Sequence, residues 1–241
     1  MKNYYYDLHI HSCLSPCGDS DNTPNNIAGM ASLCGLDIVA LTDHNSCKNC
    51  PSFFKVAEKY SIIPIAGMEL TTSEDIHVVC LFEHLEDAMR FDDFVQANRK
   101  SIKNKPEIFG EQTVLNDKDE IVACVDELLI SASFISIEDV HNIVSEFNGI
   151  CYPAHIDRDA NGVIAILGTL PDCGFDFYEI HDGSRIDEFS DRYSIPKNRF
   201  IVSSDSHYLT DMRDKEFSFS INKEDDPSAV RKHLFEYLRG N

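Results

Sequence analysis

The strongest constraint on the fold of this chain is a series of nine imidazole and carboxylate side chains, most of which end a short apolar run. They are His9, His11, Asp19, His44, Glu69, His77, His155, Asp205 and His207. Side chains so far apart in sequence share one site when the strands that carry them end at the same edge of a sheet. The pattern therefore predicts one multinuclear metal site on an α/β fold.

Seven apolar runs of strand length alternate with helical patterns, over residues 4–9, 37–44, 62–70, 77–82, 150–155, 175–181 and 200–207. This alternation predicts an α/β fold with a mostly parallel sheet. A first helix is indicated by Thr23 as N-cap, Pro24 at its first position and Gly35 just past its end. Further helices are expected over 52–59, 85–101, 137–147 and 227–238, with a hairpin near 116–120 and an extra edge strand over 217–221.

The length of 241 residues suits a single α/β barrel domain over 1–241. Within it, the segment 83–149 is expected to be a long connection between two strands that carries additional elements. A chain of this size buries about 70% of its unfolded surface, so its apolar core needs no metal for stability. We therefore expect any bound metal to serve function. The nine cysteines are an odd set, and the N-terminal residues form no apolar signal segment, which favours a cytoplasmic protein with reduced thiols. No apolar stretch approaches bilayer length, so no membrane association is expected.

Five short motifs occur in order along the chain: Asp7-Leu-His-Ile-His-Ser12, Thr42-Asp-His44, Gly67-Met-Glu69, Pro153-Ala-His155 and Asp205-Ser-His207. Alternation along a strand places the two imidazoles of the first motif on one face. Together the motifs resemble those of the PHP (polymerase and histidinol phosphatase) superfamily, over nearly the whole chain. The resemblance implies a distorted seven-stranded β/α barrel with its metal site at the C-terminal ends of the strands.

The resemblance also implies how the ligands divide among two or three divalent ions. One ion would be held by His9, His11, Glu69 and Asp205, and Glu69 would bridge to a second ion held by His77 and His155. A third ion would take Asp19, His44 and His207, with Asp21 as the alternative to Asp19. This mixture of imidazoles and carboxylates suits Zn, Mn or Fe and does not choose among them.

Ions bound in this way lower the pKa of a bound water and polarise phosphoryl oxygens, which is the chemistry of phosphoester hydrolysis. Arg158 follows a ligand closely and resembles a phosphate-contacting arginine of some family members, so we assign it to catalysis and substrate binding. Arg185 and His181 are further candidates for substrate binding. Asp43 is expected to orient a metal ligand without binding metal itself.

The formal net charge of −20 is opposite to that of proteins that grip long nucleic acid, which is therefore disfavoured as a partner. The expected substrate is a small phosphomonoester such as a nucleotide, a nucleoside bisphosphate or a sugar phosphate. The alternatives are a 5′–3′ exonuclease on short oligonucleotides, a histidinol phosphatase, an amidohydrolase and a non-catalytic metal-binding module. The sequence leaves the exact substrate, the metal and the oligomeric state open.

The remaining histidines and cysteines have simpler interpretations. His84, His141 and His233 lie in polar, helical surroundings and are expected to be surface residues. Four thiols after two of the metal-bearing strands form the alternative of a second metal site, and these are Cys13, Cys17, Cys47 and Cys50. The other cysteines fit buried, small apolar residues.

Overall fold

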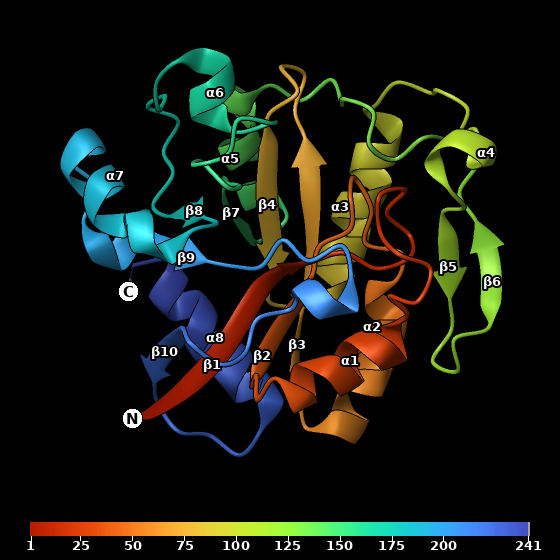
Figure 1. Cartoon of the computed structure of the whole chain (residues 1–241), viewed down its shortest axis with the longest axis horizontal. Helices are drawn as coiled ribbons and strands as arrows, with labels where there is room; N and C mark the ends of the chain where they lie inside the picture. The colour runs from red at the N-terminus through yellow and green to blue at the C-terminus, as the bar shows by residue number, and fades with distance from the viewer. Residues whose placement is uncertain (241) are drawn as a thin grey trace.

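Six strands form one curled, mixed sheet in the order β10-β1-β2-β3-β4-β7, and β8 and β9 form a separate parallel pair (Figure 1). The computed structural model describes residues 1–240. The strands are β1 (Lys2–Ile10), β2 (Ile38–Leu41), β3 (Ile63–Thr71), β4 (His77–Phe82), β5 (Thr113–Leu115), β6 (Ile121–Cys124), β7 (Gly149–Pro153), β8 (Tyr178–Ile180), β9 (Phe200–Val202) and β10 (Ser218–Ile221).

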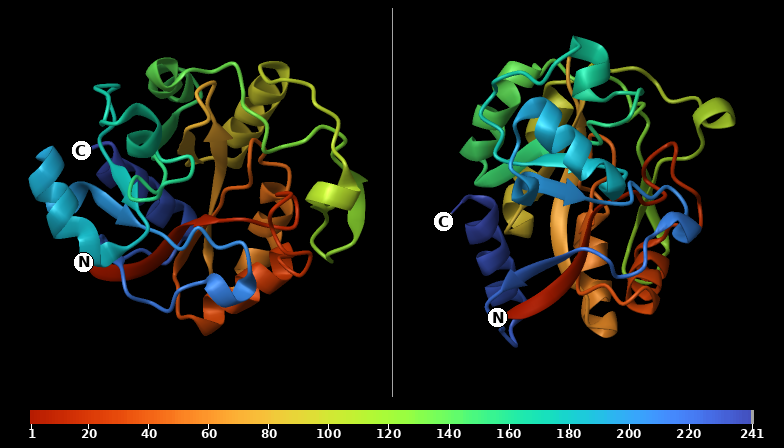
Figure 2. Two further views of the ribbon diagram at one scale, coloured as in Figure 1. Left: turned by 45° about the horizontal axis from the view of Figure 1, so that its top comes forward. Right: turned by 60° about the vertical axis from the view of Figure 1, so that its left-hand side comes forward.

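The helices cover the two faces of the curled sheet unequally (Figure 2). Residues of α1, α2, α3 and α5 belong to the apolar cluster on the outer, convex face, whereas α8 contributes to the cluster on the inner face. Both faces of the central strands are therefore apolar and buried. The helices are α1 (Pro24–Leu33), α2 (Cys50–Ala57), α3 (Leu85–Ala97), α4 (Pro106–Phe109), α5 (Ile137–Glu146), α6 (Val163–Leu167), α7 (Ile186–Tyr193) and α8 (Pro227–Leu238).

Each of the seven predicted runs overlaps a strand, and the expected hairpin and edge strand are present as β5–β6 and β10. The prediction of a mostly parallel sheet is wrong in part, because β4 runs antiparallel to both β3 and β7. Only the residues 72–76 separate β3 from β4. A parallel crossover needs a dozen residues or more, so this short connection forces the chain to reverse.

A complete seven-stranded barrel is not confirmed, because β8 and β9 stand apart from the six-stranded sheet. A few backbone hydrogen bonds connect the pair and the residues after it to the neighbouring strands. The N–H of Ile156, after β7, donates to the carbonyl of Glu179 at 2.9 Å, and the N–H of His11, after β1, donates to the carbonyl of Ser206 at 2.9 Å. These bonds draw the C-terminal ends of β1, β7, β8 and β9 together.

The segment 83–149 carries a projecting arm of α4, β5 and β6, at the right of Figure 1. Asp119, in the tip of this hairpin, accepts a 2.7 Å hydrogen bond from the hydroxyl of Thr23. The same hydroxyl caps α1 by accepting from the N–H of Asn26, so the predicted N-cap also fixes the arm. Gly35 follows the helix with φ +74°, a left-handed conformation that favours glycine.

Within residues 1–240, no helix combines the length and the apolar character that crossing a membrane requires.

The start of β7 offers a test of how tightly the outer cluster is packed. A Cβ on Gly149 would lie 2.6 Å from Cε1 of Phe82 and 2.7 Å from Cγ1 of Val144. We expect Gly149→Ala to lower the free energy of unfolding by about 1–3 kcal/mol, because the packed core has to move to admit the methyl group. Urea unfolding followed by circular dichroism measures the change.

The matched control is Gly29→Ala in the middle of α1, where the nearest atom to a Cβ is Cε1 of Tyr60 at 3.5 Å. This change should raise the free energy of unfolding by about 0.5–1 kcal/mol, because alanine loses less backbone entropy in a helix than glycine. Equal stabilities of the two variants would contradict the packing described here.

Candidate metal centre

The carboxylate of Glu69 lies at the centre of the candidate site, on the inner face of the sheet near the end of β3. His44 follows β2 and forms an isolated parallel bridge with Glu69. His77 begins β4 and pairs with Thr71 near the end of β3. Because β4 runs antiparallel, its first residue lies at the same edge of the sheet as the last residues of its neighbours. This reversal explains how a histidine at the start of a strand joins ligands at strand ends.

A register shift in β1 turns its two histidines toward the site. Tyr4, Tyr6 and Leu8 belong to the inner cluster, whereas Ile10 belongs to the outer one. The pairing with β2 shifts register between Asp7 and Ile10. Such a bulge places successive side chains on the same face. Before the shift the even-numbered residues point inward, and after it the odd-numbered residues His9 and His11 do so.

The ring nitrogens of these histidines form a compact group with Asp205. The Nε2 atoms of His9 and His11 lie 3.2 Å apart, and they lie 3.3 Å and 3.2 Å from Oδ1 of Asp205. Each of the two nitrogens also lies 3.2 Å from an oxygen of Glu69. Four ligand atoms about 2.0 Å from a tetrahedral ion are about 3.3 Å from one another. The spacing of this group therefore fits a divalent ion such as zinc.

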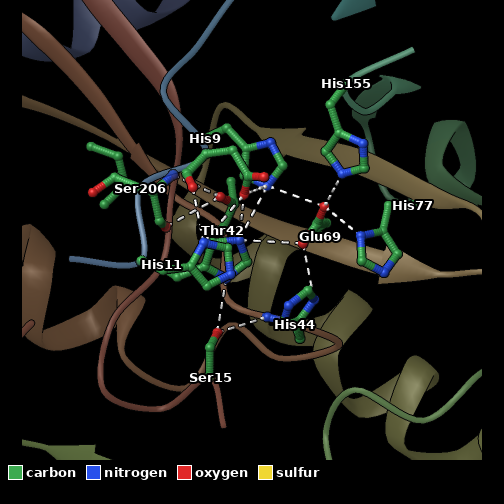
Figure 3. Close-up of polar contacts among 12 residues, drawn as sticks. His9, His11, Ser15, Thr42, His44, Glu69, His77, His155 and Ser206 are labelled. Carbon is green, nitrogen blue, oxygen red and sulfur yellow. Dashed lines mark hydrogen bonds and ion pairs between the residues drawn. The ribbon is translucent and has the colours of Figure 1, made fainter. Parts of the chain in front are cut away.

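Three further imidazoles surround the same carboxylate (Figure 3). His77 Nδ1 lies 2.8 Å and His155 Nε2 3.2 Å from Oε1 of Glu69, and His44 Nδ1 lies 2.9 Å from Oε2. Glu69 thus contacts five imidazoles with two oxygens. One carboxylate shared in this way is suited to bridging two ions.

The hydrogen bonding of the buried atoms also fits bound ions. Oε2 of Glu69 and Oδ1 of Asp205 have no hydrogen-bond partner although imidazole nitrogens surround them. A buried charge without a partner is costly, and a cation among these atoms removes that cost. On the other side of each ring, Nδ1 of His11 contacts the hydroxyl of Ser15 at 2.9 Å, and Nδ1 of His207 contacts the carbonyl of Asp205 at 2.9 Å. These contacts leave Nε2 of both rings as the metal-binding atom.

The charges of the site agree with this assignment. Burial alone lowers the pKa of His11, but Asp205 and Glu69 outweigh it and raise that pKa to about 9. Burial lowers the pKa of His44 to about 3 and that of His207 to about 4. Burial alone raises the pKa of Glu69, but the surrounding imidazoles lower it well below its usual range. Glu69 is therefore ionised and His44 and His207 are neutral near pH 7, which are the metal-binding forms, whereas an ion at His11 would displace the proton that this imidazole retains in the metal-free site.

Asp43 lies behind the candidate ligands and contacts them through a serine. Its Oδ1 accepts a 2.7 Å hydrogen bond from the hydroxyl of Ser15. The Oγ atom of Ser15 in turn contacts Nδ1 of His11 and accepts the backbone N–H of His44. Asp43 also accepts from the N–H and the hydroxyl of Ser12, at 2.8 Å and 2.7 Å. The carboxylate thus acts on two imidazole-bearing residues through one hydroxyl group.

Two residues of this surrounding layer were missed in the sequence, Ser15 and Glu179. Glu179 is fully buried on β8, and its two oxygens lie 2.9 Å and 3.1 Å from Nδ1 of His9. The available signal was an acid two residues after Phe177, in step with the buried positions of the run, whereas Asp176 is out of step and exposed. Ser15 gave no comparable signal, because a serine in a loop is common.

The structure groups the expected third set differently. His44 and His207 lie together with His11, within reach of one ion. Asp19 is half-buried, its N–H donates to the carbonyl of His207 at 2.9 Å, and its Oδ1 accepts from the N–H of Asp21 at 2.8 Å. Within residues 1–240, neither Asp19 nor Asp21 belongs to a group of ligand atoms close enough to share an ion.

Arg158 lines the rim of the metal pocket. Its guanidinium bonds to Oδ2 of Asp205 and contacts the ring of His181 at 3.0 Å. Burial and the charge of Arg158 lower the pKa of His181. Arg185 instead pairs with Glu188 at 2.9 Å and donates to a backbone carbonyl. Of the two arginines, only Arg158 therefore reaches the candidate ligands.

The backbone is strained at two of the candidate ligands. His155 has φ +28° and Asp205 has φ +50°, in a region that residues with a side chain rarely adopt. Strain of this kind costs of the order of 1–3 kcal/mol and persists where the surroundings enforce it. Both residues leave a strand at the edge where the ligands converge.

The remaining histidines and the thiols belong to none of the ligand groups among the described residues. His233 pairs with Glu224 and Glu236 on the surface, and His84 is exposed. Cys47 and Cys50 both donate toward the carbonyl of Gly67, whereas Cys13 contacts a threonine hydroxyl. In the part of the chain that the structure describes, no group of potential metal ligands includes a cysteine. The alternative of a thiolate metal site is therefore not supported.

Comparison with known proteins gives one family and a set of similar folds. The family model described as PHP domain matches residues 7–161. An uncharacterized protein of Methanocaldococcus jannaschii is 33% identical over 76 residues, covering 28% of this chain and 44% of that protein. The structure of a protein of Bifidobacterium adolescentis, named for a proposed activity as a metal-dependent phosphoesterase, is similar to this one with a TM-score of 0.57. The two sequences are 18% identical, and the match covers 96% of each chain.

Endonuclease Q, in complex with a 27-mer duplex that has an abasic lesion at the active site, has a TM-score of 0.64 at 18% identity. The match covers 99% of this chain and 57% of that one. The present chain thus spans less than two thirds of endonuclease Q and of the archaeal relative. Because a protein of this fold binds duplex DNA, the expectation that long nucleic acid is disfavoured as a partner is not supported. Net charge describes the whole surface and does not report the field at one site.

The metal assignment predicts which single changes remove an ion. His9→Ala and Asp205→Ala each remove a ligand atom from the most compact group, and we expect both to lose at least one ion per chain. Elemental analysis of protein purified with Mn, Zn or Fe supplied measures the content. The control His233→Ala removes a surface imidazole and should keep the content of the unmodified protein. Equal metal content in all three variants would contradict the assignment.

Proposed function

This chain belongs to the PHP domain family, and on that basis we propose that it is a metal-dependent hydrolase of small phosphomonoesters. The observation that carries the proposal is the contact of the Glu69 carboxylate with five imidazoles, beside the Asp205 carboxylate. We assign two or three divalent ions to this cluster. A site for one structural ion would not need so many ligands, since four suffice for zinc.

Bound divalent ions supply an activated water near neutral pH and polarise a phosphoryl oxygen. The chain itself provides the groups that position the substrate. Arg158 is 37% exposed and its planar guanidinium carries more donors than its contacts with Asp205 and His181 use, so it is placed to donate to a phosphate at the pocket rim. Asp43 and Ser15 hold His11 in place during the reaction.

The size of the metal pocket bears on the substrate. The pocket has a volume of about 140 Å³ and is lined by Glu69, Arg158, Asp205 and neighbouring imidazoles. Pockets that bury a whole drug-sized ligand have volumes of roughly 300–1,000 Å³. We therefore propose that the pocket encloses the phosphoryl group while the rest of the substrate lies outside. A terminal phosphate on a nucleotide or a sugar meets this condition.

A second candidate function is cleavage of nucleic acid. A pocket that encloses only the phosphoryl group also admits a phosphate within or at the end of a strand. The similarity in fold to endonuclease Q is consistent with this alternative. An amidohydrolase has less support, because Arg158 at the rim suits an anionic substrate better than a neutral amide.

A substrate screen of the metal-loaded protein tests the proposal. It compares nucleotides, nucleoside bisphosphates and sugar phosphates with single-stranded and duplex oligonucleotides, and measures released phosphate and strand length. Release of phosphate from the small esters is the expected result. Strand cleavage without release from small esters would establish the second candidate. Failure with every phosphoester, in protein shown to contain metal, would refute both.

The two arginines give a further prediction. Arg158→Ala should lower kcat/KM for the best phosphoester about 10- to 100-fold, because a charge-assisted hydrogen bond contributes roughly 1.5–3 kcal/mol. Arg185→Ala is the matched control and should change kcat/KM less than threefold, since Glu188 already engages that guanidinium. An equal effect of the two changes would contradict the assignment of Arg158.

A further inference from the structure

Glu179 is an ionisable side chain buried in the interior behind the metal centre. It lies in the middle of β8, and none of its surface is exposed. The inner apolar cluster around it includes Phe177 and Tyr152. A buried carboxylate is costly unless each oxygen has a donor, so its presence here needs an explanation from its contacts.

Those contacts lead to two different parts of the candidate site. Both carboxylate oxygens lie within 3.1 Å of Nδ1 of His9, and Oε1 also accepts the backbone N–H of His155 at 3.1 Å. His9 belongs to the group with Asp205. His155 contacts the same oxygen of Glu69 as His9 does, and its ring lies beside that of His77, with which we assign it to a second ion. One carboxylate therefore holds the side chain of one assigned ligand and the backbone of another.

Each contact has a defined effect on the ligand that it holds. The bond to Nδ1 of His9 makes that nitrogen the donor, so Nε2, which faces Asp205 and Glu69, is the metal-binding atom. The bond to the N–H of His155 holds a residue whose φ of +28° is unfavourable. The carbonyl of Glu179 also accepts the N–H of Ile156 at 2.9 Å, which fixes the next residue.

We propose that Glu179 is a positioning residue that orients His9 and His155 together and so couples the binding of the two ions that share Glu69. The inference rests on the metal centre of the proposed function, and is independent of which ester that centre hydrolyses. Glu179 does not bind an ion itself, because the ring of His9 stands between its carboxylate and the cluster. Glu179 therefore affects the affinity for metal ions and the geometry of the ligands that hold them.

Co²⁺ is a suitable probe, because its visible absorption reports the geometry of its ligands. The variants are Glu179→Gln and Glu179→Ala, with Glu236→Gln as the matched control on the surface of α8. Glutamine keeps the size of the side chain but carries no charge, and its NH₂ group in the place of Oε2 would face the Nδ1–H of His9, which is itself a donor. Circular dichroism and unfolding curves establish which variants are folded, and Glu179→Gln keeps the test intact if Glu179→Ala does not fold.

We expect Glu179→Gln to weaken Co²⁺ binding about 10- to 100-fold, in line with other residues that orient metal ligands, and to shift the absorption bands of the bound ion. All resolved binding steps should weaken, since the assigned ligands His9 and His155 both contact the carboxylate of Glu179. Glu236→Gln should match the unmodified protein in affinity and spectrum.

A folded Glu179→Gln that binds Co²⁺ with unchanged affinity and spectrum would overturn the inference, because a purely structural role moves stability alone. Weakening of one step with the other unchanged would overturn the coupling. If the unmodified protein binds no Co²⁺, Zn²⁺ or Mn²⁺, the metal centre and this inference both fail. Metal binding that depends on Glu179, together with a negative phosphoester screen, would leave the inference standing and refute the proposed function.

Discussion

The arrangement of this molecule depends on one buried carboxylate, Glu69, that is shared by five imidazoles. Like charges and lone pairs at distances near 3 Å repel one another unless cations lie among them. The fold brings these atoms together by ending several strands at one edge of a curled sheet. Two local departures from regular structure are required, the register shift in β1 and the antiparallel direction of β4. Apolar packing on both faces of the sheet stabilises the fold and offsets the free-energy cost of gathering these polar groups.

Polar groups behind the candidate ligands determine how the imidazole rings are oriented. Ser15, held by Asp43, faces the ring of His11, and Glu179 faces the ring of His9. In each case the outer contact engages Nδ1 and leaves Nε2 for the interior. Orientation by neighbours of this kind reduces the freedom that a ligand loses when an ion binds. The rigid inner face of the sheet is therefore as important to the centre as the identity of its ligands.

Much of this arrangement could be predicted from sequence, because strand-length apolar runs and the residues that end them are local signals. The seven strands and the convergence of His9, His11, Glu69 and Asp205 follow from periodicity and from the position of polar residues after each run. The reversal of β4 was missed although its connection is too short for a crossover. The grouping around Asp19 and the role of Glu179 depend on loop conformation and on contacts across the interior, which residue spacing does not encode.

The bond between the N–H of His11 and the carbonyl of Ser206 joins two stretches that are separated by most of the chain. On a ribosome, the residues around His9 leave the exit tunnel long before Asp205 and His207 have been synthesised. Contacts of such wide sequence separation form late, because the chain must first pay the entropy of closing a long loop. During translation the early imidazoles thus exist without their carboxylate partner. Assembly of the complete ligand set becomes a final step of maturation, and a prematurely terminated chain lacks the ligands that Asp205 and His207 contribute.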